Sequence, residues 1–134
     1  MKTRILICAL SACAFTASAQ LDVTVLPVKL AGQKAVLQLA MTNNLADPVE
    51  SARAVCFLVD GQGRMVGQST KWVIGGTKDR PPLPSKSGTT YNFVISGPEP
   101  FVATNLTAKV SFARVTLGGG RLADVAKEVR IEPQ

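Results

Sequence analysis

Apolar and polar side chains alternate along most of the chain that follows its N-terminal apolar run. From Leu37 to Thr42, for example, every second residue is leucine or methionine. A period of two places alternate side chains on one face of a β-sheet, and no segment beyond the N-terminal run has a helical period. We therefore expect strands at the following segments: Leu21 to Val25, with a break at Pro27 and a resumption at Val28 to Leu30; Lys34 to Thr42; Ala52 to Val59; Arg64 or Met65 to Ile74; Tyr91 to Ile95; Leu106 to Ala113; and a last strand that includes Val125, Val129 and Ile131.

Residues typical of turns separate these segments. Asn43 and Asn44 tolerate a left-handed backbone, and Asp60-Gly61-Gln62-Gly63 is typical of a tight hairpin. Gly67 indicates a β-bulge, and Ala52 to Val59, which is apolar on both faces near its end, indicates a central strand. Short strands joined by such turns predict an all-β fold, a two-sheet antiparallel β-sandwich of about seven strands.

Residues 1–19 have the composition of an export signal. Lys2 and Arg4 precede an apolar run from Ile5 to Phe15, and Ala17-Ser18-Ala19 fits a cleavage site. The apolar run, at about 11 residues, is shorter than the about 20 that a membrane-spanning helix needs. We therefore expect a signal peptide at 1–19, a single domain at 20–134, and an exported protein that is periplasmic or secreted.

A second interpretation of the leader is a lipoprotein signal. Leu10-Ser11-Ala12-Cys13 is similar to the lipobox of bacterial lipoproteins, in which the cysteine is acylated and becomes the first residue of the mature protein. Only the short run from Ile5 to Ala9 precedes it, which favours ordinary cleavage. Membrane association is expected only if Cys13 is lipidated.

Charge and composition exclude several classes of function. The 15 basic and nine acidic residues give a formal charge of +6, which falls to +4 if Lys2 and Arg4 leave with the leader. There is no dense run of lysine and arginine interleaved with aromatic residues, so we expect no nucleic-acid partner. The chain has no histidine, which removes Ser-His-Asp and Cys-His catalysis and the commonest zinc ligand. We therefore expect no enzyme, no catalytic or metal-binding residues and no cofactor, and a buried, unreactive Cys56.

Four stretches of the chain resemble small exported bacterial domains of the FxLYD type. They are Thr42-Asn43-Asn44, Phe57-Leu58-Val59-Asp60-Gly61, Gly63-Arg64-Met65-Val66 and Ser87-Gly88-Thr89-Thr90-Tyr91-Asn92-Phe93. The chain departs from the pattern at Val59, where that family has an aromatic residue. The resemblance implies an immunoglobulin-like sandwich in an exported protein, and it implies no catalytic residues.

The segment from Gly75 to Gly88 has no periodicity and contains three prolines, which predicts a long loop. Its basic residues, together with Lys71, give residues 71–86 a net charge of +3. Long loops in small domains are often functional surfaces, and prolines reduce the entropy that is lost on binding. The candidate partner-binding residues are Lys78, Arg80, Pro82, Leu83 and Lys86, with Leu83 as an exposed apolar tip. The alternative is a stiff connection between the two sheets.

These observations favour a non-catalytic exported β-sandwich that acts as a binding or assembly module of the bacterial cell envelope and contacts a protein partner. The alternative is a structural or adaptor subunit of a membrane-associated complex that is anchored through a lipidated Cys13. The sequence makes no prediction of the oligomeric state.

Overall fold

The computed structural model describes residues 19–97, 101 and 106–133. Residues 1–18 of the expected leader, which include Cys13, therefore lie outside the described residues. The elements are β1 (Leu21–Val25), β2 (Lys29–Ala31), β3 (Lys34–Asn43), β4 (Val49–Val59), β5 (Met65–Ile74), β6 (Gly88–Ser96), β7 (Thr107–Leu117), the 3₁₀ turn η2 (Gly118–Gly120), α2 (Val125–Glu128) and β8 (Val129–Pro133).

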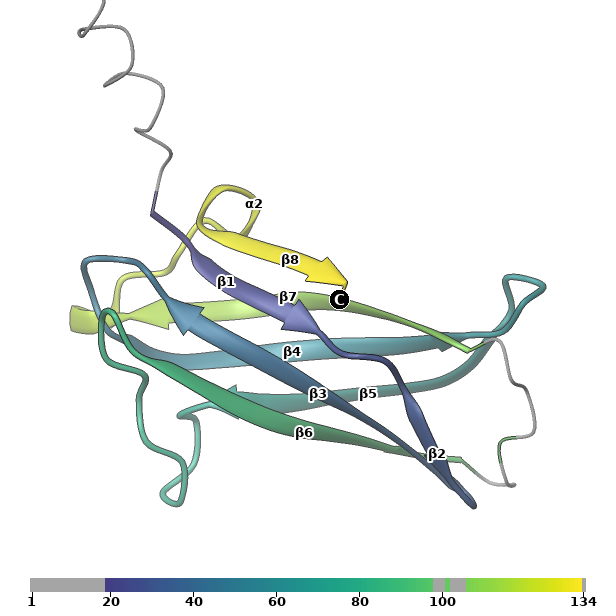
Figure 1. Cartoon of the computed structure of the whole chain (residues 1–134). Helices are drawn as coiled ribbons and strands as arrows, with labels where there is room; N and C mark the ends of the chain where they lie inside the picture. Colours follow the sequence, from purple (N-terminus) through teal and green to yellow (C-terminus); the bar gives the residue numbers. More distant parts are fainter. Residues whose placement is uncertain (1–18, 98–100, 102–105, 134) are drawn as a thin grey trace, which may run out of the picture.

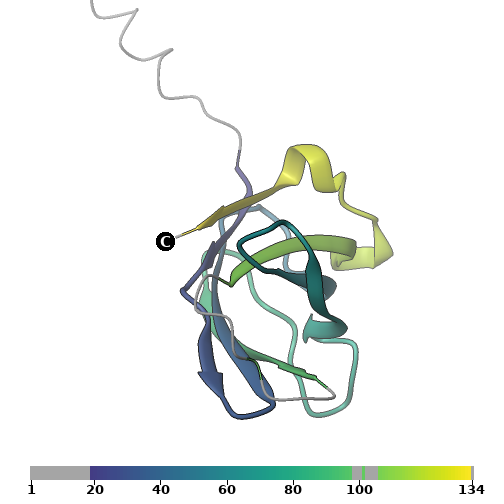
Figure 2. The same ribbon diagram turned by 90° about the vertical axis from the view of Figure 1, so that its right-hand side faces the viewer.

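The strands form two sheets that lie in two layers (Figures 1 and 2). The first sheet contains β2, β3, β1 and β8, with β6 along the other edge of β3; the second has the order β5-β4-β7. The predicted all-β sandwich is confirmed, with β4 in the predicted central position. The one departure from antiparallel pairing among the described strands is the parallel pair β1–β8.

Pro27 explains why one edge of β3 is shared by two short strands. Proline has no backbone N–H to donate, so the ladder stops there. β1 pairs with the second half of β3 and β2 with its first three residues. Between them, the N–H of Leu26 donates to the carbonyl oxygen of Gln38 at 3.0 Å, which holds the chain against β3.

The core consists of the inward-pointing residues of both sheets, as the alternation predicts. Ala52, Ala54, Cys56 and Leu58 of β4 are fully buried, and they face Leu37, Leu39, Phe93 and Ile95 in the same core cluster. Cys56 is buried as expected, and desolvation raises the pKa of its thiol to about 11. Cys56 is a free thiol, so the core formed by the described residues is held without a disulfide.

The predicted hairpin and bulge are also found. The Asp60 carboxylate accepts hydrogen bonds from the backbone N–H groups of Gln62 and Arg64, at 2.9 and 3.0 Å, and Gly63 has the positive φ of 81°. Along β4 and β5 the register shifts between Leu58 and Val59, which leaves Val66 without a partner, next to Gly67.

Several boundaries differ from the sequence prediction. β4 begins three residues earlier, at Val49, and β7 continues to Leu117. Val125, which was expected in the last strand, lies instead in the helix α2, which four residues are too few to reveal as a helical period. The helix starts where the Asp124 carboxylate accepts from the N–H of Ala126, at 3.1 Å, and Glu128 accepts from the N–H of Asp124, at 2.8 Å. No helix in the described part of the chain is long and apolar enough to span a membrane.

Candidate binding site

The loop between β5 and β6, residues 75–87, folds back onto one end of the sandwich (Figure 1). Leu83 and Val49 exchange two backbone hydrogen bonds, each with 2.9 Å between nitrogen and oxygen. The Leu83 side chain is only 5% exposed and belongs to the core. The prediction of an exposed apolar tip is therefore wrong. Burial of a leucine side chain contributes about 1.5–3 kcal/mol to stability, which favours this position over an exposed one.

Asn43, at the end of β3, holds the loop in place through hydrogen bonds of its side chain. Its side chain is fully buried, and its Nδ2 donates to the carbonyl oxygens of Leu83 and Asp47, at 3.1 and 3.0 Å. Its Oδ1 accepts from the N–H of Leu45 at 2.9 Å. The left-handed backbone expected at Asn43 and Asn44 is not found, since among the described residues other than glycine only Lys86 has a positive φ.

Two glycines allow the loop to turn sharply after β5. Gly75 and Gly76 have φ of 55° and 78°. A Cβ on Gly75 would lie 1.9 Å from the carbonyl oxygen of Glu50, and one on Gly76 would lie 2.4 Å from the ring of Trp72. Neither position can therefore hold a side chain without a shift of the loop.

A pocket of about 270 Å³ lies between this loop and the start of β6. Arg80 and Tyr91 form one side of it, with the guanidinium carbon 5.1 Å from the ring centre of Tyr91. Tyr91 is held in turn by an edge-to-face contact with Phe93. The lining consists of Val73, Ile74, Arg80, Pro81, Pro82, Leu83, Pro84, Ser87, Gly88, Thr89, Thr90 and Tyr91.

The guanidinium of Arg80 has no carboxylate partner in the described part of the chain, and it lies over the Tyr91 ring. A cation–π contact of this kind attracts the guanidinium to the aromatic face and uses none of its N–H donors. Ser87, Thr89 and Thr90 add hydroxyl groups, so the lining is partly polar and partly apolar. The pocket can therefore receive a small apolar group that carries a carboxylate.

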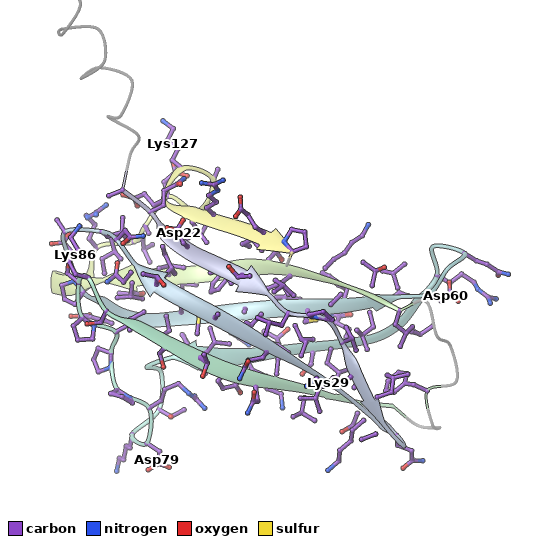
Figure 3. All side chains as sticks on the ribbon, viewed as in Figure 1. Asp22, Lys29, Asp60, Asp79, Lys86 and Lys127 are labelled. Carbon is purple, nitrogen blue, oxygen red and sulfur yellow. The ribbon has the colours of Figure 1, made fainter. Side chains whose placement is uncertain are left out.

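The structure brings together only some of the predicted residues. Arg80, Pro82 and Leu83 line the pocket, whereas Lys78 and Lys86 do not. Figure 3 shows Asp79, next to Lys78, pointing away from the sandwich, and Lys86 at a separate place near the end of β3. The Nζ of Lys86 donates to the carbonyl oxygen of Asn44 at 3.2 Å, which links the loop to the turn that follows β3.

Tyr91, Thr89 and Thr90 were missed as pocket residues. The alternation places Tyr91 in a strand, but its contact with Arg80 depends on how the loop returns, which no local pattern shows. Within residues 19–97, 101 and 106–133, no three Cys, Asp or Glu side chains gather closely enough to hold a metal ion.

Comparison with protein-family models finds no match, and comparison with curated proteins finds none either. The resemblance to FxLYD domains therefore stays a prediction.

Proposed function

We propose that this chain is a non-catalytic, exported binding module of the bacterial cell envelope, and that it holds an acidic segment of a protein partner in the pocket beneath residues 75–87. The observation that carries the proposal is the Arg80 guanidinium, which lies over the Tyr91 ring and lines a partly apolar pocket without a carboxylate partner among the described residues. Arginine in this state binds carboxylates through two parallel hydrogen bonds.

The size of the pocket supports a segment of a polypeptide as the ligand. Small-molecule sites usually enclose about 300–1,000 Å³, and this pocket is about 270 Å³. That volume suits one or two side chains of an extended segment. The net positive charge of the loop, with Lys78, Arg80 and Lys86 against Asp79, favours an acidic segment.

The loop is also prepared for binding before the partner arrives. Pro81, Pro82 and Pro84 restrict its backbone, and the bonds of Leu83 to Val49 and Asn43 fix its middle. A preorganised loop loses little entropy on binding. The missing histidine and the scattered acids agree with a module that binds and does not catalyse.

The experiment is site-specific photocrosslinking in cells, followed by binding measurements with the purified partner. A photoreactive residue at Thr90, in the pocket, is expected to capture a protein that the same residue at Ser96, exposed at the other end of β6, does not capture. Arg80→Gln is then expected to weaken binding of that protein by about tenfold or more, since a hydrogen bond to a charged group contributes about 1.5–3 kcal/mol.

Lys78→Gln is the matched control, because it removes the same charge from the same loop outside the pocket. It is expected to change the affinity by less than about twofold. Equal capture at Ser96 and Thr90, or equal effects of the two substitutions, would contradict the proposal.

A further inference from the structure

Basic and apolar side chains lie side by side on the outward-facing surface of the β5–β4–β7 sheet, and the register of the strands shows which of them are neighbours. Outward residues of β4 alternate with the buried Ala52, Ala54, Cys56 and Leu58. Their partners on β5 and β7 complete four rows across the sheet, which together we call the outer face: Trp72–Arg53–Arg114, Thr70–Val55–Ser111, Gln68–Phe57–Lys109 and Met65–Val59–Thr107.

Every charged residue of the outer face is basic. Arg53, Lys109 and Arg114 are exposed, and none of them has an ion pair within the described residues. The ion pairs of the described residues lie elsewhere: Asp60 with Arg64, Asp47 and Glu128 with Arg121, and Glu132 with Arg130. The outer face therefore has cations whose charge the described part of the chain does not neutralise.

Arg53 and Arg114 are cross-strand neighbours, at a register shift between β4 and β7. The Arg53 guanidinium lies over the Trp72 ring on β5, whereas Arg114 is on β7, on the other side of β4. The two guanidinium groups therefore present their N–H donors at separate places on one exposed face, and phosphate oxygens are acceptors that suit such donors.

Apolar side chains accompany the cations. Val55, Phe57 and Val59 are half-buried along the middle of the outer face, and Met65 at its far end is 57% exposed. Trp72 lies at the other end, with the guanidinium carbon of Arg53 5.7 Å from its ring centre. Tryptophan is enriched where protein meets the headgroup region of a membrane.

We infer that the outer face binds a membrane surface that carries anionic phospholipid headgroups, separately from the pocket described above. Charge complementarity selects an anionic occupant, and it rejects a second copy of this chain because two basic faces repel each other. A broad sheet face with dispersed cations and half-buried apolar residues matches the extended plane of a bilayer. The phosphate is that of the headgroup.

The test is co-sedimentation of the protein, as recovered from cells, with vesicles. One set contains equal parts phosphatidylglycerol and phosphatidylcholine, and the other contains phosphatidylcholine alone. Three cations at about 1 kcal/mol each predict roughly a hundredfold preference for the anionic vesicles. Trp72 is the only tryptophan of the chain, so a blue shift of its emission with anionic vesicles reports contact at the outer face itself.

The decisive variant is Arg53→Gln with Arg114→Gln, for which the same arithmetic predicts about thirtyfold weaker binding. Lys29→Gln with Lys34→Gln is the matched control, since both lysines are exposed on β2 and β3 of the other sheet. It is expected to weaken binding by less than about threefold, because these charges lie away from the contact. A double change to lysine, Arg53→Lys with Arg114→Lys, keeps the charge and is expected to retain most of the binding if the protein stays folded by circular dichroism.

Four results would overturn the inference. The first is equal binding to both vesicle types, as a lipid chain on Cys13 would cause, and the second is an equal loss of binding in the two glutamine variants. The third is full displacement by millimolar inorganic phosphate, which would indicate a free-phosphate site. The fourth is binding of polyglutamate through Arg53 and Arg114 without binding of vesicles, which would indicate an acidic protein as the partner.

Discussion

The side-chain amide of Asn43 donates a hydrogen bond to the carbonyl oxygen of Leu83, 3.1 Å away in the protein interior. The two residues are forty positions apart, and this contact joins the end of β3 to the middle of the loop that covers the pocket. The position of Arg80 therefore depends on a polar group inside the sandwich.

Replacement of Asn43 by alanine is expected to destabilise the protein by about 2–3 kcal/mol, because the Asp47 carbonyl oxygen and the Leu45 N–H lose their side-chain partner and the Leu83 carbonyl oxygen keeps only Val49. Urea unfolding measures the change. Asn92→Ala is the control: its side chain is exposed and accepts a long bond of 3.4 Å from Gln38, so a change within about 0.5 kcal/mol is expected. Similar effects of the two substitutions would show that Asn43 does not hold the loop.

Leu83→Ala tests the burial of the loop. We expect a loss of about 2–4 kcal/mol in the free energy of unfolding, as for other buried leucines. Leu122→Ala is the matched control, since Leu122 is 58% exposed, and it is expected to change stability by no more than about 0.5 kcal/mol. If thermal unfolding shows both variants equally stable, Leu83 is not a core residue in solution.

Gly76→Ala tests the turn that follows β5. The new methyl group would lie 2.4 Å from the Trp72 ring, whereas Gly119→Ala meets nothing within 4 Å at a similar φ of 80°. Both changes carry the cost of a left-handed backbone, about 1–2 kcal/mol. Only Gly76→Ala is expected to cost more and to shift the emission of Trp72. An unchanged emission spectrum would argue against this packing.

Burial of the Cys56 thiol predicts that the free energy of unfolding decreases at alkaline pH. Burial raises the pKa of its thiol from 9.0 to about 11, so the unfolded chain releases this proton first. Stability from this group is complete below pH 9 and falls as the pH rises toward 11. Urea midpoints between pH 8 and 10.5 are expected to decline more steeply in the natural protein than in Cys56→Ala. Parallel declines would contradict the buried thiol.

The leader can be tested by intact mass. We expect protein recovered from the producing bacterium to begin at Gln20, because the apolar run before Cys13 is short for a lipoprotein signal. A mass that contains diacylglycerol on Cys13 would instead support the anchored adaptor.

Alternation predicted most of the strands, because a period of two is a local property. The central place of β4 was predicted instead from apolar residues on both of its faces. Leu83 was misplaced because its neighbours are prolines, while its true partner, Val49, lies in another element. Arg80 was identified from its charge, but Tyr91 was not, since their contact crosses from loop to strand. The pairing of Arg53 with Arg114 likewise depends on register, which the pattern of a single strand does not determine.

The parallel pair of β1 and β8 has a consequence for biosynthesis. Leu21 lies beside Val129, so β1 gains this neighbour only after residues 22–128 have been synthesised. Until then β1 keeps one open flank, and closing so long a contour carries a large entropic cost. If the chain is exported as we propose, the missing neighbour of β1 gives a translocation machinery time to engage the chain before this sheet is complete.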